Sequence, residues 1–256
     1  MAIDINNEVV LTPPVPSATV ILLRDAAEGL QVLLMRRHAA SGVLGGVHVF
    51  PGGKLDPADM SRPSIGVSAA QVQALAEPVL DAATAAALYL AGVRETWEEC
   101  GLRLDVASLW PWSRWITPRQ PSVTNKRFDT RFFVAAAPDG QEARHDNHEA
   151  TEAVWLTPRE GLQRYWDGAI DLAPPQIMSL AQLARLDSAQ QALAWARSRP
   201  PALVEPEPFD EDGCRVICYP GDPRHSIAQP VWDGPTRLTH RNRRFEPEGG
   251  LAALLG

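Results

Sequence analysis

Apolar residues recur at helical spacing along residues 82–100 and predict an amphipathic helix there. At 100° per residue, one face carries the residues predicted to be core, Ala86, Leu90, Val93, Trp97 and Cys100. The opposite face carries three carboxylates, Glu95, Glu98 and Glu99. Asp81 is suited to cap the start of this helix, and Gly101 is suited to end it in the left-handed conformation. The pattern therefore predicts a helix whose last turns present a carboxylate cluster away from the core.

Shorter periodic stretches surround this helix and predict an α/β fold. Residues 17–24 and 30–37 are rich in Val, Ile and Leu and are joined by a short turn, so they form a predicted hairpin. Further strands are predicted at residues 47–50, 127–136, 202–206 and 214–219, and further helices at 157–167 and 176–199. The chain of 256 residues is 45% hydrophobic, which suits one elaborated domain over residues 1–256.

Composition narrows the function classes. The chain has 24 Lys and Arg against 31 Asp and Glu, a net charge of −7, which argues against a surface that coats nucleic acid. An anionic substrate would need a local positive patch or a bound metal. Cys100, Cys214 and Cys218 are few and odd in number, as in a reducing compartment. No apolar run reaches the roughly 20 residues that span a bilayer, and residues 1–15 are acidic where a signal peptide is basic. We expect a cytoplasmic protein that has no membrane partner.

The carboxylate cluster is the strongest chemical feature of the sequence. Like charges three and four residues apart destabilise a helix, and the negative end of the helix dipole adds to the cost. A solvated acidic face is the ordinary interpretation of such a pattern. Arg94, immediately ahead of the cluster, and the upstream glycine loop of residues 50–53 favour a bound cation instead.

Together these segments resemble the Nudix box, Gly-x5-Glu-x7-Arg-Glu-U-x-Glu-Glu-x-Gly-U, where U is a bulky apolar residue. The matching residues are Gly53, Arg94, Glu95, Glu98, Glu99, Gly101 and Leu102. Thr96 replaces the first apolar residue, and Asp59 stands where the first Glu belongs. Residues 60–93 separate Asp59 from Arg94, which is 34 residues where the pattern has 7. The box is therefore split by an insertion.

An interruption at this point is similar to that of the coenzyme A diphosphatases of the Nudix superfamily. Members that cleave coenzyme A carry a further pattern, Leu-Leu-Thr-x-Arg-Ser-x3-Arg-x3-Gly-x3-Phe-Pro-Gly-Gly, ahead of the glycines. Leu33, Leu34, Arg37, Gly46 and residues 50–53 fit it. Met35, His38 and Gly42 replace its Thr, its Ser and its second Arg.

The resemblance implies a fold and a set of site residues. The implied fold is an α/β/α sandwich with a mixed sheet, an insertion over residues 60–80 and a helical C-terminal extension over residues 174–256. The implied metal ligands, for Mg²⁺ or Mn²⁺, are the carbonyl of Gly52 and the carboxylates of Glu95, Glu98 and Glu99. Glu98 and either Glu149 or Glu152 are the implied catalytic carboxylates, and Arg37 and Gly53 the implied substrate contacts.

The implied activity is hydrolysis of a diphosphate linkage in a nucleoside diphosphate derivative. Coenzyme A or acyl-coenzyme A is the first choice of substrate, and ADP-ribose or a nucleotide sugar is the second. A Nudix-fold binding module without turnover is the alternative from another class. The Trp-rich segment 109–116 suits stacking on a nucleobase, but large aromatics also fill cores and homodimer interfaces, and the sequence leaves these alternatives open.

Overall fold

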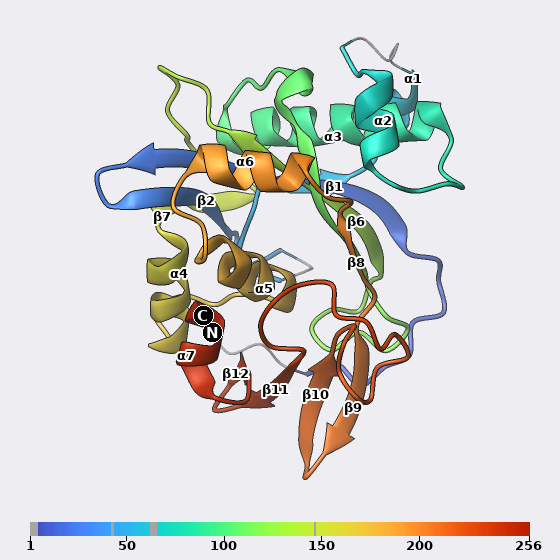
Figure 1. The fold of residues 1–256 in the computed structure, drawn as a ribbon, viewed down its shortest axis with the longest axis vertical. Coiled ribbons are helices and arrows are strands. Elements are labelled where there is room, and N and C mark those ends of the chain that lie inside the picture. Colours follow the sequence, from blue (N-terminus) through green and yellow to red (C-terminus); the bar gives the residue numbers. More distant parts are fainter. Residues whose placement is uncertain (1–4, 42–43, 62–65, 146) are drawn as a thin grey trace.

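The computed structural model describes residues 5–41, 44–61, 66–145 and 147–256. Gly42, Asp146 and residues 62–65 of the insertion therefore lie outside the described residues. The centre of the fold is a mixed eight-stranded sheet with helices on both faces (Figure 1). The predicted α/β class is thus confirmed. No helix among the residues described is long and apolar enough to span a membrane.

Strands β1 to β8 build this sheet, in the order β3-β2-β1-β6-β5-β8, with β4 paired to β1 and β7 paired to β2. Their bounds are β1 Val15–Ala26, β2 Gly29–Arg37, β3 His48–Val49, β4 Gly52–Lys54, β5 Trp110–Ile116, β6 Phe128–Ala136, β7 Ala150–Leu156 and β8 Ala202–Val204. The central pair β1 and β6 is parallel, whereas β1 and β2 form the predicted antiparallel hairpin. The short strand β8 pairs parallel with β5 and ties the C-terminal extension to the main sheet.

Alternating side chains of β1 supply two cores. Val20 and Leu22 pack with helix α3 (Ala82–Cys100), whereas Ile21 and Leu23 pack with helices α5 and α6 on the other face. The remaining helical segments are α1 Pro57–Ser61, α2 Ala69–Ala74, the 3₁₀ turn η1 Val106–Ser108, α4 Pro158–Trp166, α5 Pro174–Leu183, α6 Ala189–Arg197 and α7 Gly250–Leu255. In Figure 1, α3 and α5 lie on opposite sides of β1, which gives the sandwich its layers.

The C-terminal extension is not purely helical. It contains a second, antiparallel sheet in the order β12-β11-β10-β9, with β9 Glu207–Glu211, β10 Cys214–Cys218, β11 Arg237–Arg241 and β12 Arg244–Glu246. The helix predicted over residues 176–199 is wrong in its extent, because the chain turns after Leu183 and Ser188 caps a new helix by accepting from the N–H of Gln191. The assignment of residues 1–256 to a single domain stays a prediction.

Helix α3 has the predicted bounds, but the predicted core face is correct only in part, because Ala86 and Cys100 are buried and Trp97 is not. Asp81 accepts from the N–H of Thr84, and Gly101 ends the helix at φ 72°. Trp97, predicted to be core, is 45% exposed and stacks under the Arg103 guanidinium. The buried stripe instead runs through Gly92, where an added Cβ would crowd core side chains of the sheet. The carboxylates on that side of α3 consequently face the sheet.

Candidate active site

The glycine loop, residues 50–53, runs between β3 and β4 and lies against the end of α3. A Cβ added at Gly52 would overlap the backbone of β1 at Ala18 and Thr19. A Cβ added at Gly53 would overlap the carboxylate of Glu95. A side chain is therefore excluded at Gly52 by backbone, whereas a side chain at Gly53 would displace the Glu95 carboxylate.

The three carboxylates of α3 differ in exposure. Glu99 is 5% exposed, and its Oε2 accepts a hydrogen bond of 3.0 Å from the N–H of Gly52. The side chain of Glu95 is 13% exposed and that of Glu98 is 53% exposed. The cluster thus extends from a buried carboxylate at the glycine loop to one that reaches solvent.

Arg94 joins the two halves of the split box. Its guanidinium contacts Asp59 at 2.9 Å, Glu95 at 2.9 Å and Glu98 at 2.8 Å. It also donates to the carbonyl oxygen of Lys54. The hydrogen bond to the buried Asp59 carboxylate is the largest cause that raises the pKa of Arg94 above its usual range. The ends of the insertion therefore meet, as the spacing predicted, and Asp59 acts as a structural partner of Arg94.

The insertion itself is anchored away from the site. Gln71 on α2 donates to the carbonyl oxygens of Val106 and Leu109, and Glu77 pairs with Arg131 of β6 at 2.6 Å. No residue of residues 60–61 or 66–80, the described part of the insertion, lines the pocket described below. The described part of the insertion is thus tied to β6 and to the segment before β5, and not to the pocket.

Burial and repulsion alter the proton affinity of two carboxyl groups. Burial raises the pKa of Glu99 to about 8, against the opposing effects of the Gly52 N–H and of Arg37. The negative charges of Glu95 and Glu149 raise it further. Burial also raises the pKa of Glu95, while Arg94 lowers it. The positive charge next to these carboxylates is therefore too small to hold them all ionised near neutral pH.

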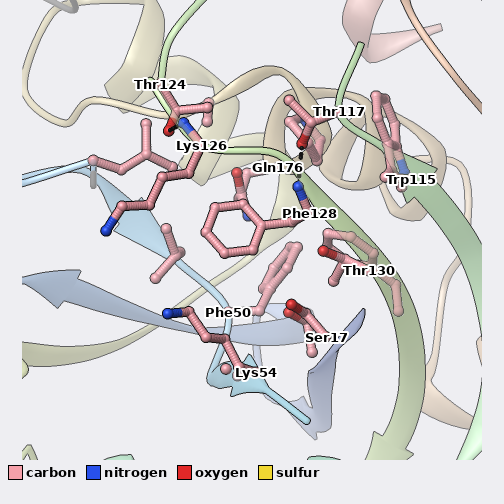
Figure 2. A pocket seen from close by; sticks show the side chains of 18 of the residues that line it. Ser17, Phe50, Lys54, Trp115, Thr117, Thr124, Lys126, Phe128, Thr130 and Gln176 are labelled. Atoms are coloured by element: carbon pink, nitrogen blue, oxygen red, sulfur yellow. Dashed lines mark hydrogen bonds between the residues drawn. The ribbon is translucent and has the colours of Figure 1, made fainter. Parts of the chain in front are cut away.

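A pocket of about 820 Å³ opens beside the cluster. Glycine-loop residues, Glu95 and Glu98 line one part of it, and residues of α5 and of the segment 115–128 line another. Figure 2 shows Phe50 and Phe128 on its wall, with Lys54, Lys126 and Gln176. Trp115 also lines it, whereas Trp112 is a core residue that packs on Trp195 of α6. The core interpretation therefore holds for Trp112.

The structure separates the two candidate carboxylates that follow in the chain. Glu149 and Arg37 line the pocket, and Glu149 lies close enough for its charge to raise the pKa of both Glu95 and Glu99. Glu152 is outside the lining residues and lies 3.6 Å from the buried ring of His48. The pairing of β2 with β7 shifts register between Arg36, which lies opposite Glu152, and Arg37, which lies opposite Ala150. The shift therefore lies between Glu152 and the pocket residue Glu149.

Sequence reasoning missed three polar residues of the pocket. Lys54 and Lys126 are the two lysines of the chain, so their rarity among the basic residues was an available signal. Gln176 offered no signal, because the apolar pattern around it predicts only a helix. Its place on the pocket wall follows from how α5 packs, which the local sequence does not encode.

The donor set fits a hard divalent cation. Carboxylate and carbonyl oxygens are the ligands that Mg²⁺ and Mn²⁺ prefer, and Glu95, Glu98 and Glu99 supply such oxygens beside the Gly52 backbone. Within the described ranges, no three His, Cys, Asp or Glu side chains gather closely enough to hold a metal as they stand. Arg94 Nη1 contacts one oxygen of Glu95 and one oxygen of Glu98, and the second oxygen of each carboxylate has no hydrogen bond to Arg94.

Comparisons with known proteins identify what the chain is similar to. A sequence model of the NUDT19 Nudix domain matches residues 104–183, a segment that begins after α3. The acyl-coenzyme A diphosphatase NUDT19 of Xenopus laevis is 24% identical, over 60% of this chain and 59% of that protein. The human protein of that name is 26% identical, over 63% of this chain and 62% of its own length. The chain thus spans less than two thirds of the length of these relatives.

Among solved structures, a NUDIX hydrolase from Alicyclobacillus acidocaldarius superposes with a TM-score of 0.58 at 23% identity. The superposition covers 72% of this chain and 97% of that one. At this identity the likeness establishes the fold. Sequence and fold together confirm that this chain resembles the Nudix hydrolase superfamily and, within it, the acyl-coenzyme A diphosphatases.

Proposed function

We propose that the chain is a metal-dependent hydrolase that cleaves the diphosphate linkage of a nucleoside diphosphate derivative. The observation that carries this proposal is the buried Glu99, held by the Gly52 N–H beside Glu95 and next to a pocket of about 820 Å³. A cluster of this kind suits a cation and an anionic substrate together. The names of the relatives favour coenzyme A or acyl-coenzyme A as the substrate.

In this mechanism the Gly52 carbonyl, Glu95, Glu98 and Glu99 would hold Mg²⁺ or Mn²⁺, which would supply charge neutralisation at the diphosphate and a lowered pKa for a water molecule. Glu149, which lines the same pocket, takes the proton from the attacking water, and geometry favours it over Glu152. Gly53 lets the backbone approach the diphosphate, and Arg37 contributes positive charge on the pocket wall.

Arg94 has a positioning role in this proposal. Its contacts hold Glu95 and Glu98 beside the glycine loop before the metal binds. Because Asp59, from the other half of the box, accepts hydrogen bonds from the same guanidinium, Arg94 is held in place independently of Glu95 and Glu98.

The test is incubation with coenzyme A, an acyl-coenzyme A, ADP-ribose and a nucleotide sugar, each with Mg²⁺ or Mn²⁺. Phosphorus NMR identifies the products. We expect the diphosphate of coenzyme A or acyl-coenzyme A to be replaced by two new phosphomonoester groups, one on each product, and the Glu98→Gln variant to form them at least about 10²-fold more slowly. If only ADP-ribose or only the nucleotide sugar is cleaved, that compound would identify the substrate class. Binding without any cleavage would instead identify a binding module.

A further inference from the structure

The side-chain amide of Gln176 is unpaired on the pocket wall. Gln176 is 6% exposed, and its Oε1 is fully buried without a hydrogen-bond partner in the described part of the chain. Its neighbour on the same helix, Gln182, is 9% exposed, and its amide donates to the Met178 carbonyl. A buried polar group without a partner costs folding free energy. Gln176 therefore has a property that packing does not explain.

The start of α5 presents this amide and no backbone donor. Pro174 and Pro175 carry no N–H, and the N–H groups of Gln176 and Ile177 both donate to the Ala173 carbonyl. A helix N-terminus whose backbone N–H groups are already hydrogen-bonded is poorly suited to bind an anion. The amide of Gln176 offers instead one acceptor and one donor side by side, which suits a neutral polar group.

The surrounding wall favours a flat or extended organic group. Phe50, Phe128 and Trp115 line the same pocket, with Pro174 and Pro175 of α5 (Figure 2). Aromatic and proline faces pack on flat apolar surfaces, and the polar edge of such a group then needs a partner.

We propose that Gln176 binds an amide-like edge of the substrate, an N–H donor next to an acceptor. This proposal rests on the proposed function. Such an edge occurs on a nucleobase and on an amide in the group at the other end of the diphosphate. Both groups present one hydrogen-bond donor and one acceptor, which the acceptor and donor of the Gln176 amide can pair with.

Calorimetry on the whole chain in EDTA tests this inference without turnover. The ligands are coenzyme A, which has both the base and amides, and adenosine 3′,5′-bisphosphate, which has only the base. We expect Gln176→Met to weaken coenzyme A binding about tenfold, the loss that one good hydrogen bond implies. Gln182→Met is the matched control and should bind as the parent does, because its amide is paired outside the pocket.

The two ligands identify the source of the contact. Equal losses for both ligands would assign Gln176 to the base, and a loss for coenzyme A alone would assign it to an amide. Unchanged binding of coenzyme A by Gln176→Met would overturn the inference. The proposed function is tested separately, by the hydrolysis assay. Failure of the parent protein to hydrolyse any substrate would count against that function.

The lysines support a second, independent inference. Lysine supplies two of the 24 Lys and Arg side chains, and both Lys54 and Lys126 line the pocket. They come from β4 and from the segment before β6, and Figure 2 shows their side chains extending along the same side of the pocket. Within the described ranges, neither ammonium group has an ion pair, whereas Arg94 contacts three carboxylates.

We also infer that Lys54 and Lys126 bind an anionic group of the substrate. A lysine ammonium is a compact charge that binds phosphate from many directions. The anion is either the diphosphate itself or a further phosphate elsewhere on the substrate. Coenzyme A and dephospho-coenzyme A distinguish these sources, because they differ in one phosphate monoester.

Hydrolysis of both compounds by Lys54→Gln and Lys126→Gln provides the test. We expect each variant to raise the KM for coenzyme A about tenfold, and charge-preserving Lys→Arg variants to restore it in part. A similar rise for dephospho-coenzyme A would assign the lysines to the diphosphate. A rise for coenzyme A alone would assign them to the extra phosphate.

The control variant removes one positive charge at a position outside the pocket. Arg159→Gln on α4 lowers the net charge by the same amount at an exposed position that does not line the pocket. Its KM should match the parent's. An unchanged KM for coenzyme A in both lysine variants, or an equal rise in Arg159→Gln, would overturn the inference.

Discussion

Two ion networks of this molecule have similar geometry but different charge balance. In the structural network, Arg114 and Arg131 pair with Glu77 and Asp129, so two cations meet two anions. In the site network, the single guanidinium of Arg94 contacts Asp59, Glu95 and Glu98, and the buried Glu99 adjoins them. The difference suggests that a balanced network holds the fold together, whereas an acidic surplus beside a pocket suits a cation and catalysis.

The largest expected effect is on turnover. Glu98→Gln or Glu99→Gln should lower kcat by at least about 10²-fold, because a multidentate site loses an anionic ligand. Glu77→Gln, which removes the same charge from the structural network, should leave kcat near that of the parent. Steady-state kinetics on the three variants with Mg²⁺ make the comparison. Equal kcat in all of them would remove the functional distinction between the networks.

The structural network should dominate stability. The Glu77 and Arg131 side chains are 6% and 5% exposed, so Glu77→Gln leaves the guanidinium groups of Arg114 and Arg131 to share the single charge of Asp129. We expect a loss of about 3 kcal/mol in the free energy of unfolding, within the range for a broken buried pair. Glu98→Gln should cost less than about 1 kcal/mol, because that carboxylate is half exposed. Urea denaturation followed by circular dichroism measures both values, and the reverse order would contradict the account.

The sequence predicted where helix α3 begins and ends better than it predicted which surfaces the helix packs against. The bounds of α3 were correct because Asp81 and Gly101 are local signals that act within one turn. Its buried face was correct at Ala86 and Cys100 but wrong at Trp97, because Gly92 lets the helix approach the sheet and Thr96 hides its hydroxyl by donating to the Gly92 carbonyl. Both effects depend on a partner surface that periodicity does not contain.

Long-range pairing decided the rest of the site. The contact between Asp59 and Arg94 agrees with the split Nudix pattern. A long insertion can bring its two ends together because the entropy cost of closing a loop grows only slowly with its length. The choice of Glu149 over Glu152 as a pocket residue depends on the pairing of β2 with β7, and that register lies beyond local sequence. The assignments of metal ligands and of the catalytic base remain predictions.

A smaller effect concerns pH in the absence of metal. Burial raises the pKa of Glu99 in the folded protein to about 8 from its ordinary value of 4.5, so protonation of this carboxyl group favours folding. This contribution is fully present below about pH 4.5 and is lost as the pH rises through about 8. In EDTA, Glu99→Gln should therefore melt with a weaker pH dependence than the parent over this window. Parallel melting profiles would show that Glu99 is not the titrating group.

Metal-dependent melting tests the central claim most directly. The parent, Glu99→Gln and Glu77→Gln are scanned at pH 8 in EDTA and in increasing Mg²⁺ or Mn²⁺. A ligand at 100 times its Kd that binds only the folded state adds about 2.7 kcal/mol. The account predicts a saturable rise in Tm for the parent, an equal rise for Glu77→Gln from a lower starting point, and a smaller rise for Glu99→Gln. Parallel responses of all three proteins would mean that the carboxylates of α3 are ordinary acidic side chains.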